Sequence, residues 1–345
     1  MQQEIPPLVR ELAAVAHVAA HQPAPPAPAT SAPPLPAHPP AVPPPAAPCR
    51  ACRGSAAAAV LADRDDGTVV RHGGAVAKAH APGTDIAAHR ARLAVAAHPR
   101  LAGILLPPLP VTAPDVHGRP VTAWPYGTPV DPADPDAAPW EDAAALLARL
   151  HSVPPAELPA PLPPMRGPAK AARAVARMGA AGPHPAAAPV RAAWRRLPGW
   201  ARGEGPPPGP ERLCHGDLHL GQLIRHPAAT GPWLLIDVDD LGMGDPAWDL
   251  ARPAAWYAAG LLPPLVWSRF LGAYRAAGGP AVPPEGDPWP RLDVPARALT
   301  VQTAALAIAK STVERRDLDE VELSVVDACA RIATLPPELA REVSS

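Results

Sequence analysis

The chain has 345 residues, a formal net charge of −1 at pH 7 and 56 prolines. This length accommodates one two-lobed domain with an adequate core, and the near-neutral charge lacks the basic footprint typical of nucleic-acid binding. No run approaches the roughly 18 apolar residues that span a bilayer, and the N-terminus, with prolines at positions 6 and 7, lacks the basic region of a signal peptide. We therefore expect a cytoplasmic protein without a nucleic-acid or membrane partner.

The first 52 residues divide into two segments. Residues 1–21 place Leu8, Leu12 and Val15 at helical spacing, which predicts one amphipathic helix that docks onto the rest of the chain. Residues 22–52 are rich in Pro and Ala, and a segment of this composition cannot bury a core. We predict a disordered, polyproline-like linker there.

The next segment reads TVVRH, then Gly73-Gly74, then AVAKAH. A Gly-Gly pair supplies the positive φ angles of a tight two-residue turn, so the pattern predicts a β-hairpin. Lys78 would then lie in the second strand. The following segment, IAAHRARLAVAAHPRLAG, contains no carboxylate.

Two further elements follow along the chain. The sequence PVTAWPYGTPV predicts a strand that stops at Pro125. The sequence PWEDAAALLARLHSVP has Trp140, Ala144, Leu147 and Leu150 on one side at helical spacing, and it ends at a proline. We predict a helix there.

Two short strands are predicted from Gln222 to Arg225 and from Leu234 to Asp237, joined by the turn-rich connector HPAATGPW. If Arg225 pairs with Leu234, the same register puts Gln222 opposite Asp237. Side chains paired in this way have Cβ atoms roughly 5 Å apart. An amide oxygen and a carboxylate at that separation suit one Mg²⁺ ion, which prefers hard oxygen ligands.

Asp217 lies in the sequence HGDLHLGQ at residues 215–222, in the loop that enters this hairpin. A hydroxyl nucleophile needs a carboxylate within hydrogen-bond reach to orient it and accept its proton. Phosphoryl transfer otherwise depends on positioning and charge neutralisation. An acid, an amide and a second acid at this spacing therefore predict phosphoryl transfer from a magnesium nucleotide to a small molecule.

The segment from Cys214 to Ala251 resembles the aminoglycoside phosphotransferase and choline kinase branch of the protein-kinase-like fold. Those enzymes carry HGDxxxxN followed by IDxxxxGxGDPxxDLA. The matching positions here are His215, Gly216, Asp217, Gln222, Ile236, Asp237, Gly242, Gly244, Asp245, Pro246, Asp249, Leu250 and Ala251. One position departs, because Gln222 stands where the family usually has Asn; the HGDxHxGQ form resembles that of maltokinase-like enzymes.

The resemblance implies an α+β, two-lobed protein-kinase-like fold. A small β-rich N-lobe is expected at residues 53–127 and a larger, mainly helical C-lobe at 128–345, with the catalytic loop at 215–222 and the metal-binding segment at 236–251. The expected activity is ATP-dependent phosphorylation of a hydroxyl on an aminoglycoside, sugar or metabolite.

The resemblance also implies cofactors and residue roles. ATP and Mg²⁺ would be the cofactors, Asp217 the catalytic base, and Gln222 and Asp237 the metal ligands. Structural support of the site would come from His215, Asp245 and Asp249.

For the nucleotide, the resemblance implies contacts of Lys78 with phosphates and of Ala123, Trp124, Pro125 and Tyr126 with adenine. The family's glutamate partner for the lysine is missing; Asp85 is the nearest carboxylate, and no pair is assigned. The residues from Arg64 to Gly67 are a candidate tip of the phosphate-covering loop.

Three other interpretations compete. His215, Asp217 and His219, as alternate residues on one strand, would be metal ligands of a hydrolase. LLIDVDDL resembles the nucleophile motif of haloacid-dehalogenase phosphatases, a fold that needs a parallel sheet after this motif. A nucleotide-binding pseudokinase with a regulatory role would explain Gln222 and the missing glutamate.

The four cysteines give little support for a metal site. Cys49 and Cys52 form one CxxC without a second pair at finger-like spacing. Cys214 and Cys329 are expected to be buried thiols.

The acceptor is the least determined part, because this fold hosts kinases for choline, homoserine, methylthioribose, sugars and antibiotics. Acidic and basic residues are nearly balanced, at 32 and 31. An uncharged sugar or a metabolite hydroxyl thus fits at least as well as an aminoglycoside.

Helices are expected at 254–277 and 297–333. Carboxylates of these helices, including Glu314, Asp317, Asp319 and Glu320, either face a cationic substrate or, as we prefer, form a solvated helix face.

Overall fold

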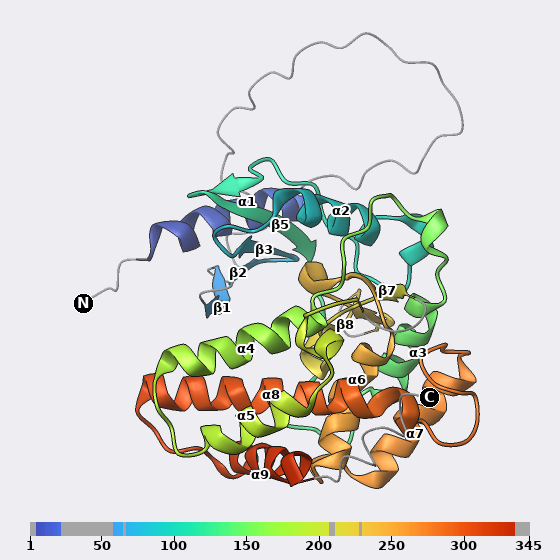
Figure 1. The fold of residues 1–345 in the computed structure, drawn as a ribbon. Helices are drawn as coiled ribbons and strands as arrows, with labels where there is room; N and C mark the ends of the chain where they lie inside the picture. Colours follow the sequence, from blue (N-terminus) through green and yellow to red (C-terminus); the bar gives the residue numbers. More distant parts are fainter. Residues whose placement is uncertain (1–4, 22–57, 65–66, 207–210, 228–229, 335–345) are drawn as a thin grey trace. The chain divides into compact units, whose positions relative to one another are not determined.

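The computed structural model describes residues 5–21, 58–64, 67–206, 211–227 and 230–334 (Figure 1). The predicted linker at 22–52, with Cys49 and Cys52, lies outside the described residues, as do the two central residues of the 64–67 loop. The chain divides into two compact units. The smaller unit takes the described residues of Met1–Ile86, Pro107–Gly127 and His226–Ala229, and the larger unit those of Ala87–Leu106, Thr128–Arg225 and Thr230–Ser345.

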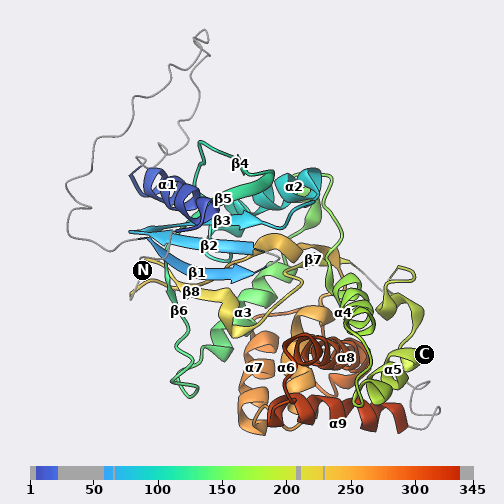
Figure 2. The same ribbon diagram turned by 90° about the vertical axis from the view of Figure 1, so that its left-hand side faces the viewer.

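The smaller unit contains a five-stranded antiparallel sheet in the order β1-β2-β3-β5-β4. Its strands are β1 (Ala59–Arg64), β2 (Gly67–His72), β3 (Ala75–His80), β4 (Asp115–Val116) and β5 (Arg119–Pro125). Helix α1 (Pro7–His21) lies along this sheet and packs on β2 and β3 (Figure 2). Leu12 and Val15 are buried against Val70 and Ala77 of the strands. The predicted amphipathic helix thus docks as expected.

The predicted hairpin is confirmed by the pairing of β2 with β3. His72 pairs with Ala75, and Gly73 between them has φ +56°, the left-handed conformation that glycine adopts without a steric penalty. Lys78 lies in β3, opposite Val69 on one side and Thr122 of β5 on the other. β5 ends at Pro125, also as predicted.

The larger unit is mainly helical. Its longer helices are α2 (Ile86–Ala96, all but its first residue), α3 (Trp140–His151), α4 (Gly167–Ala181), α5 (Ala187–Arg196), α6 (Ala247–Ala258), α7 (Pro264–Ala276), α8 (Trp289–Glu314) and α9 (Glu320–Thr334). Two small antiparallel sheets join β7 (Arg212–Cys214) with β10 (Gly242–Gly244), and β6 (Thr128–Pro129), β8 (Leu223–Arg225) and β9 (Trp233–Leu235). Helix α3 matches its prediction, since Ala144, Leu147 and Leu150 are fully buried.

Residues 87–106 group with the larger unit, although the expected N-lobe at 53–127 includes them. The reason is visible in their contacts. Arg92 of α2 donates through Nε to the carbonyl of Leu241 at 2.8 Å, and Leu105 bridges to Leu235 of β9.

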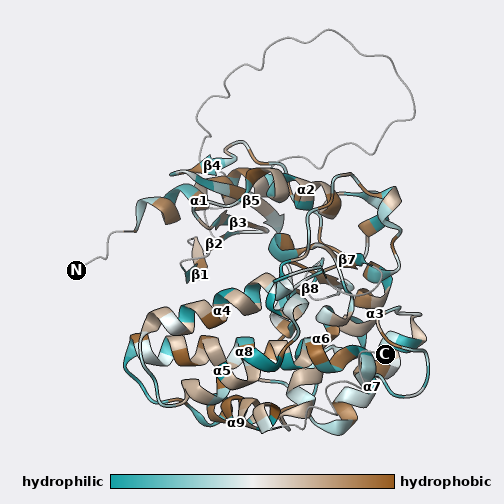
Figure 3. Cartoon of the chain, in the orientation of Figure 1, coloured by the Kyte–Doolittle hydropathy of each residue, from teal (hydrophilic) through white to brown (hydrophobic). Residues whose placement is uncertain are grey.

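The core of the larger unit forms around α8, which packs against α4, α6 and α9. Met178, Val301, Ile308 and Val326 belong to its main hydrophobic cluster, and Figure 3 shows hydrophobic residues distributed along α8 and α9. The described residues include no helix with both the length and the apolar character needed to cross a membrane.

Two predicted helices are wrong in extent. The segment 254–277 is broken into α6 and α7 at Gly260, whose φ of +80° and the prolines that follow end one helix and start the next. The segment 297–333 is broken at Arg315, which has φ +53° and ends α8. Apolar periodicity continues on both sides of each break, so the sequence pattern alone does not reveal where one helix ends and the next begins.

The predicted register of the β8–β9 hairpin is wrong by one residue. Arg225 pairs with Trp233 rather than Leu234, and Ile236 donates its N–H to the carbonyl of Gln222 at 2.9 Å. A shift of one residue moves side chains to the other face, and this register lets Leu223 and Leu235 be fully buried together. Gln222 therefore lies opposite Ile236, and Asp237 follows after the strand has ended.

Candidate active site

The loop that carries Asp217 starts where β7 ends and is shaped by Gly216. This glycine has φ +84°, and a Cβ added to it would collide with the carbonyl oxygen of Asp240. Glycine is needed here for both reasons. The loop can therefore lie directly against the segment after Asp237.

The backbone of this loop is held by Asp249 of α6. The Asp249 carboxylate accepts the N–H of His215 at 2.6 Å and the N–H of Gly216 at 2.7 Å, and Nε2 of His151 lies 2.9 Å away. Burial alone would raise the pKa of Asp249, but the hydrogen bond from His151 and the neighbouring donors lower it below its usual value. An ionised carboxylate thus anchors the start of the loop.

A buried chain of hydrogen bonds extends from this anchor to α7. Tyr274 accepts the N–H of Ala281 at 2.9 Å, and its hydroxyl lies 2.8 Å from Nδ1 of His151. The network assigns the tautomer: Tyr274 donates to Nδ1, and Nε2–H of His151 donates to Asp249. The side chains of this hydrogen-bonded network are fully or almost fully buried. The polar atoms of each therefore depend on the others for their hydrogen bonds.

His215 and Asp245 have separate contacts that fit supporting roles. Nε2 of His215 lies 2.8 Å from the carbonyl of Ile236, the residue before Asp237. Asp245 accepts the N–H of Ala247 at 3.0 Å at the start of α6 and also binds Arg291. Burial raises the pKa of Asp245, against the opposing effects of these two partners.

Asp217 itself lies between two cations that the sequence analysis missed. Its Oδ2 is 2.7 Å from Nζ of Lys170 on α4, and its Oδ1 is 2.8 Å from a guanidinium nitrogen of Arg252 on α6. Burial would raise the pKa of Asp217, but the charges of Lys170 and Arg252 lower it to about 2. The Asp217 carboxylate is thus ionised, and both of its oxygens have a cationic partner.

The charge pairing continues into the segment after Asp237. Nζ of Lys170 is also 2.6 Å from Asp240, whose other oxygen lies 3.2 Å from Nε of Arg166. Arg252 further donates through Nε to the carbonyl of Leu218 at 3.0 Å. Alternating charges therefore link α4, the Asp217 loop and α6.

A backbone hydrogen bond brings the two predicted metal ligands, Gln222 and Asp237, close together in the fold. Gln222 is buried and ends a short 3-10 turn (Leu220–Gln222), and its carbonyl binds the residue before Asp237. Asp237 has φ +63°, a conformation in which Asp is enriched. Non-glycine residues in this conformation cluster at functional sites.

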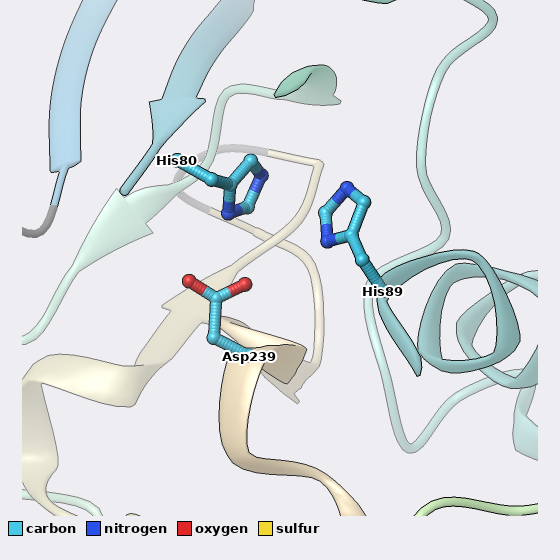
Figure 4. A group of neighbouring side chains, drawn as sticks. All are labelled: His80, His89 and Asp239. Carbon is cyan, nitrogen blue, oxygen red and sulfur yellow. The ribbon is translucent and has the colours of Figure 1, made fainter. Parts of the chain in front are cut away.

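Figure 4 shows a polar side chain of α2 that lies near Asp239. His89 of α2 and Asp239 point toward one another, and their nearest ligand atoms lie within 4.8 Å. The helix that lacks the expected glutamate thus carries a buried histidine beside the segment after Asp237. His80 in the same view belongs to the smaller unit, where its Nε2 is 2.9 Å from Oγ1 of Thr122.

The predicted nucleotide contacts lie in the smaller unit. Ala123 to Tyr126 follow one another at the end of β5, beside the strand that carries Lys78. Tyr126 donates its N–H to Gly74 at 2.8 Å, and the guanidinium of Arg71 lies 3.5 Å from the centre of its ring. The N–H of Tyr126 is therefore already engaged.

A narrow pocket adjoins Asp217 in the larger unit. Gly167, Trp248, Arg252 and Gln302 are among its walls, and its volume of about 10 Å³ corresponds to about one water molecule. The carboxylates considered as possible contacts of a cationic substrate are not among the residues lining this pocket: Glu314 binds Arg316, and Asp319 accepts the N–H of Glu322 at the start of α9.

The hydrolase interpretations do not match this geometry. His215 to His219 form a loop, not a strand, so the three side chains do not alternate on one strand face. The described residues after Asp237 continue as one 3-10 turn, one short antiparallel strand and four α-helices, without the parallel sheet that a haloacid-dehalogenase fold requires.

The small antiparallel-sheet unit, the mainly helical unit and the loop that carries Asp217 match the arrangement expected of a kinase-like small-molecule phosphotransferase. The model of the phosphotransferase enzyme family, APH, matches residues 59–289, more than half of the chain. The chain belongs to this family. A comparison with curated protein sequences finds no match.

Solved structures share the fold. A choline/ethanolamine kinase family protein from Mesorhizobium loti aligns with a TM-score of 0.53 and 16% identity, covering 86% of this chain and 95% of that one. A thermostable mutant of aminoglycoside phosphotransferase APH(4)-Ia aligns with a TM-score of 0.54 and 13% identity, covering 82% and 97%. Spectinomycin phosphotransferase APH(9)-Ia gives 0.51 and 13%, covering 83% and 92%. At these identities the likeness concerns the fold alone.

Proposed function

We propose that the protein transfers the γ-phosphoryl group of ATP to a hydroxyl of a small molecule, with Mg²⁺. The observation that carries the proposal is the anchoring of the Asp217 loop by the Asp249 carboxylate. It presents one ionised carboxylate beside the segment that follows Asp237, where Lys170 joins Asp217 to Asp240. Solved relatives in complex with ADP and spectinomycin, and with AMP-PNP and hygromycin B, support the use of a nucleotide.

Asp217 would orient the acceptor hydroxyl and receive its proton. A pKa of about 2 makes it a weak base. In a loose transition state, however, positioning and electrostatic stabilisation dominate over proton abstraction. Lys170 and Arg252 hold the carboxylate in place and would offset the negative charge that gathers around the transferred group.

Gln222 and Asp237 fit magnesium by the chemistry of their donors, a carboxamide oxygen and a carboxylate. They would hold the ion through these atoms, and the ion would neutralise phosphate charge when bound. Lys78 and the stretch from Ala123 to Tyr126 remain the predicted contacts for phosphates and adenine. A cytoplasmic location also remains a prediction.

Calorimetric titration with magnesium ATP tests the proposal. Binding that requires both Mg²⁺ and an intact Asp237, compared in wild type and Asp237→Ala, would support the nucleotide site. The exposed Asp327 of α9 provides a control, since Asp327→Ala removes a carboxylate far along the chain and should bind as wild type does. An absence of binding in all three proteins would refute the proposal.

The alternative of a regulatory pseudokinase is not favoured by family membership. It predicts magnesium ATP binding without ADP release from any acceptor. Measuring ADP release in the presence of hydroxyl compounds separates the two.

A further inference from the structure

Helix α4 carries a row of basic side chains that starts beside Asp217. Arg166, which immediately precedes the helix, and Lys170, Arg173 and Arg177 follow at intervals of four, three and four residues, which places the last three on one face of the helix. We call this set the α4 basic row. Arg166 and Lys170 are partly buried, whereas Arg173 and Arg177 are exposed.

The buried face of α4 lies about 100° around the helix from the row, because each of its residues directly follows a residue of the row. Ala171, Ala174 and Met178 are buried, and the last two belong to the hydrophobic cluster around α8. Burial of this face fixes the rotation of the helix about its axis. The basic row therefore stays outside the helical core.

The inner end of the row is tied to the residue that would meet the acceptor. Lys170 binds Asp217 and Asp240, and Arg252 approaches Asp217 from α6. Any acceptor whose hydroxyl reaches Asp217 must lie close to these cations.

The positive charge that is not paired lies at the outer end of the row. Asp217 and Asp240 pair with three cations, namely Lys170, Arg252 and Arg166, and Asp237 and Asp239 add carboxylates to the same segment. The two outer arginines of the row form no ion pair among the described residues. Burial lowers the pKa of Arg173, and the charge of Arg166 lowers it further, against a smaller opposing effect of Asp240. Like charges are therefore crowded along the row.

Two other elements packed against α4 supply no net negative charge to the outer end of the row. In the turn packed against α4, Glu204 pairs with Arg202. On α8, Asp293 pairs with Arg297. A polycationic acceptor would meet repulsion here, whereas an anionic group would be attracted.

We propose that the acceptor is a hydroxyl compound bearing a carboxylate or a phosphate, and that the α4 basic row attracts this anionic group. The inference rests on the proposed kinase function. Its distinguishing claim is the charge of the acceptor.

The first test measures ADP release with magnesium ATP and four pools of hydroxyl compounds: uncharged sugars, amino sugars, sugar acids and sugar phosphates. Release that is fastest with sugar acids or sugar phosphates is expected, and the two pools distinguish carboxylate from phosphate. Fastest release with uncharged or amino sugars would overturn the assignment. If the protein binds magnesium ATP but no pool promotes release, the anionic-acceptor assignment also fails, while the nucleotide site stands.

The second test removes the outer charges with the double variant Arg173→Gln, Arg177→Gln. For the best anionic acceptor, KM should rise roughly tenfold at low salt, and the effect should shrink as salt screens the charges. The kcat and the KM for ATP should stay unchanged. The exposed pair Arg191 and Arg195 on α5 provides a matched control, because Arg191→Gln, Arg195→Gln removes equal charge.

The pattern of KM changes decides the outcome. A rise in the KM for ATP instead of the acceptor would assign the row to the nucleotide and overturn the proposal. Equal effects of the α4 and α5 variants would show a general influence of net charge, which would overturn it as well.

Discussion

Nζ of Lys170 lies 2.7 Å from one carboxylate oxygen of Asp217 and 2.6 Å from Asp240. A single lysine from α4 thus joins the loop expected to orient the acceptor to the segment that follows the expected metal ligand. This relationship makes Lys170 a positioning residue for Asp217. It also makes the ionisation of Asp217 measurable through substitutions of a different residue.

Asp217→Ala should lower kcat by several powers of ten, because it removes the group that orients the acceptor hydroxyl; general-base groups typically contribute about 10²–10⁴-fold. Nucleotide binding should persist, since Gln222 and Asp237 remain. Steady-state ADP release and calorimetry check the two parts. Activity equal to that of wild type would rule out Asp217 as the base.

Lys170→Met should shift the pH dependence of kcat/KM. In wild type the pKa of Asp217 is about 2, so Asp217 should cause no loss of activity on the acid side until the pH approaches that value. Loss of the Lys170 charge raises the pKa of Asp217, and the acid limb should move to higher pH. Lys170→Arg should keep the wild-type profile, as should Lys310→Met at an exposed site on α8. An unshifted acid limb in Lys170→Met would contradict the pairing.

The same pairing should contribute to stability in a defined pH range. The pKa of Asp217 is lowered from 3.8 to about 2 on folding, which corresponds to on the order of 2 kcal/mol. Because the folded-state pKa is the lower one, this contribution is present above about pH 4 and is lost as the pH falls toward 2. Urea unfolding of wild type and Asp217→Asn at several pH values should show a difference that shrinks on acidification. A difference that grows would have the wrong sign.

Gly216→Ala should destabilise the fold more than Gly73→Ala. Both glycines have positive φ, but a Cβ at Gly216 meets the carbonyl oxygen of Asp240, whereas a Cβ at Gly73 meets nothing within 4 Å. Backbone strain alone costs about 1–2 kcal/mol for alanine, so the excess at Gly216 reports the close approach. Chemical denaturation of both variants provides the comparison; equal losses would show that the loop can move away from Asp240.

Tyr274→Phe should destabilise the protein by about 1–3 kcal/mol, because it leaves Nδ1 of His151 and the N–H of Ala281 without their partner. Activity should fall only modestly, since Asp249 keeps its two bonds to the loop backbone. Asp249→Asn should reduce both stability and kcat. Urea unfolding and ADP release on the two variants separate the roles, and a loss of kcat in Tyr274→Phe as large as in Asp249→Asn would place the tyrosine in the positioning of the loop.

Gln222→Asn should retain or raise activity, because asparagine presents the same carboxamide oxygen and is the residue usual in the family at this position. The magnesium dependence of ADP release provides the measurement. Complete loss of activity would mean that the extra methylene of Gln222 has a role particular to this chain.

Local patterns predicted much of the fold. The Gly73-Gly74 turn, the end of β5 at Pro125 and the buried face of α3 were all recognisable, because short-range backbone geometry and periodicity determine them. The breaks at Gly260 and Arg315 and the register of β8 with β9 were not. There the apolar pattern permits two solutions, and the burial of side chains such as Leu223 and Leu235 selects one.

The sequence by itself determined the chemistry of the loop and of the segment after it, because the motif residues are close in the chain and their types specify an acid, an amide and a second acid. Only the tertiary structure decided which charged side chains surround Asp217. Arg252 is 35 residues away and reaches it from α6, and Lys170 reaches it from α4. Both helices are placed by their packing on α8, so the electrostatic surroundings of the aspartate depend on a core whose side chains are remote from it in sequence.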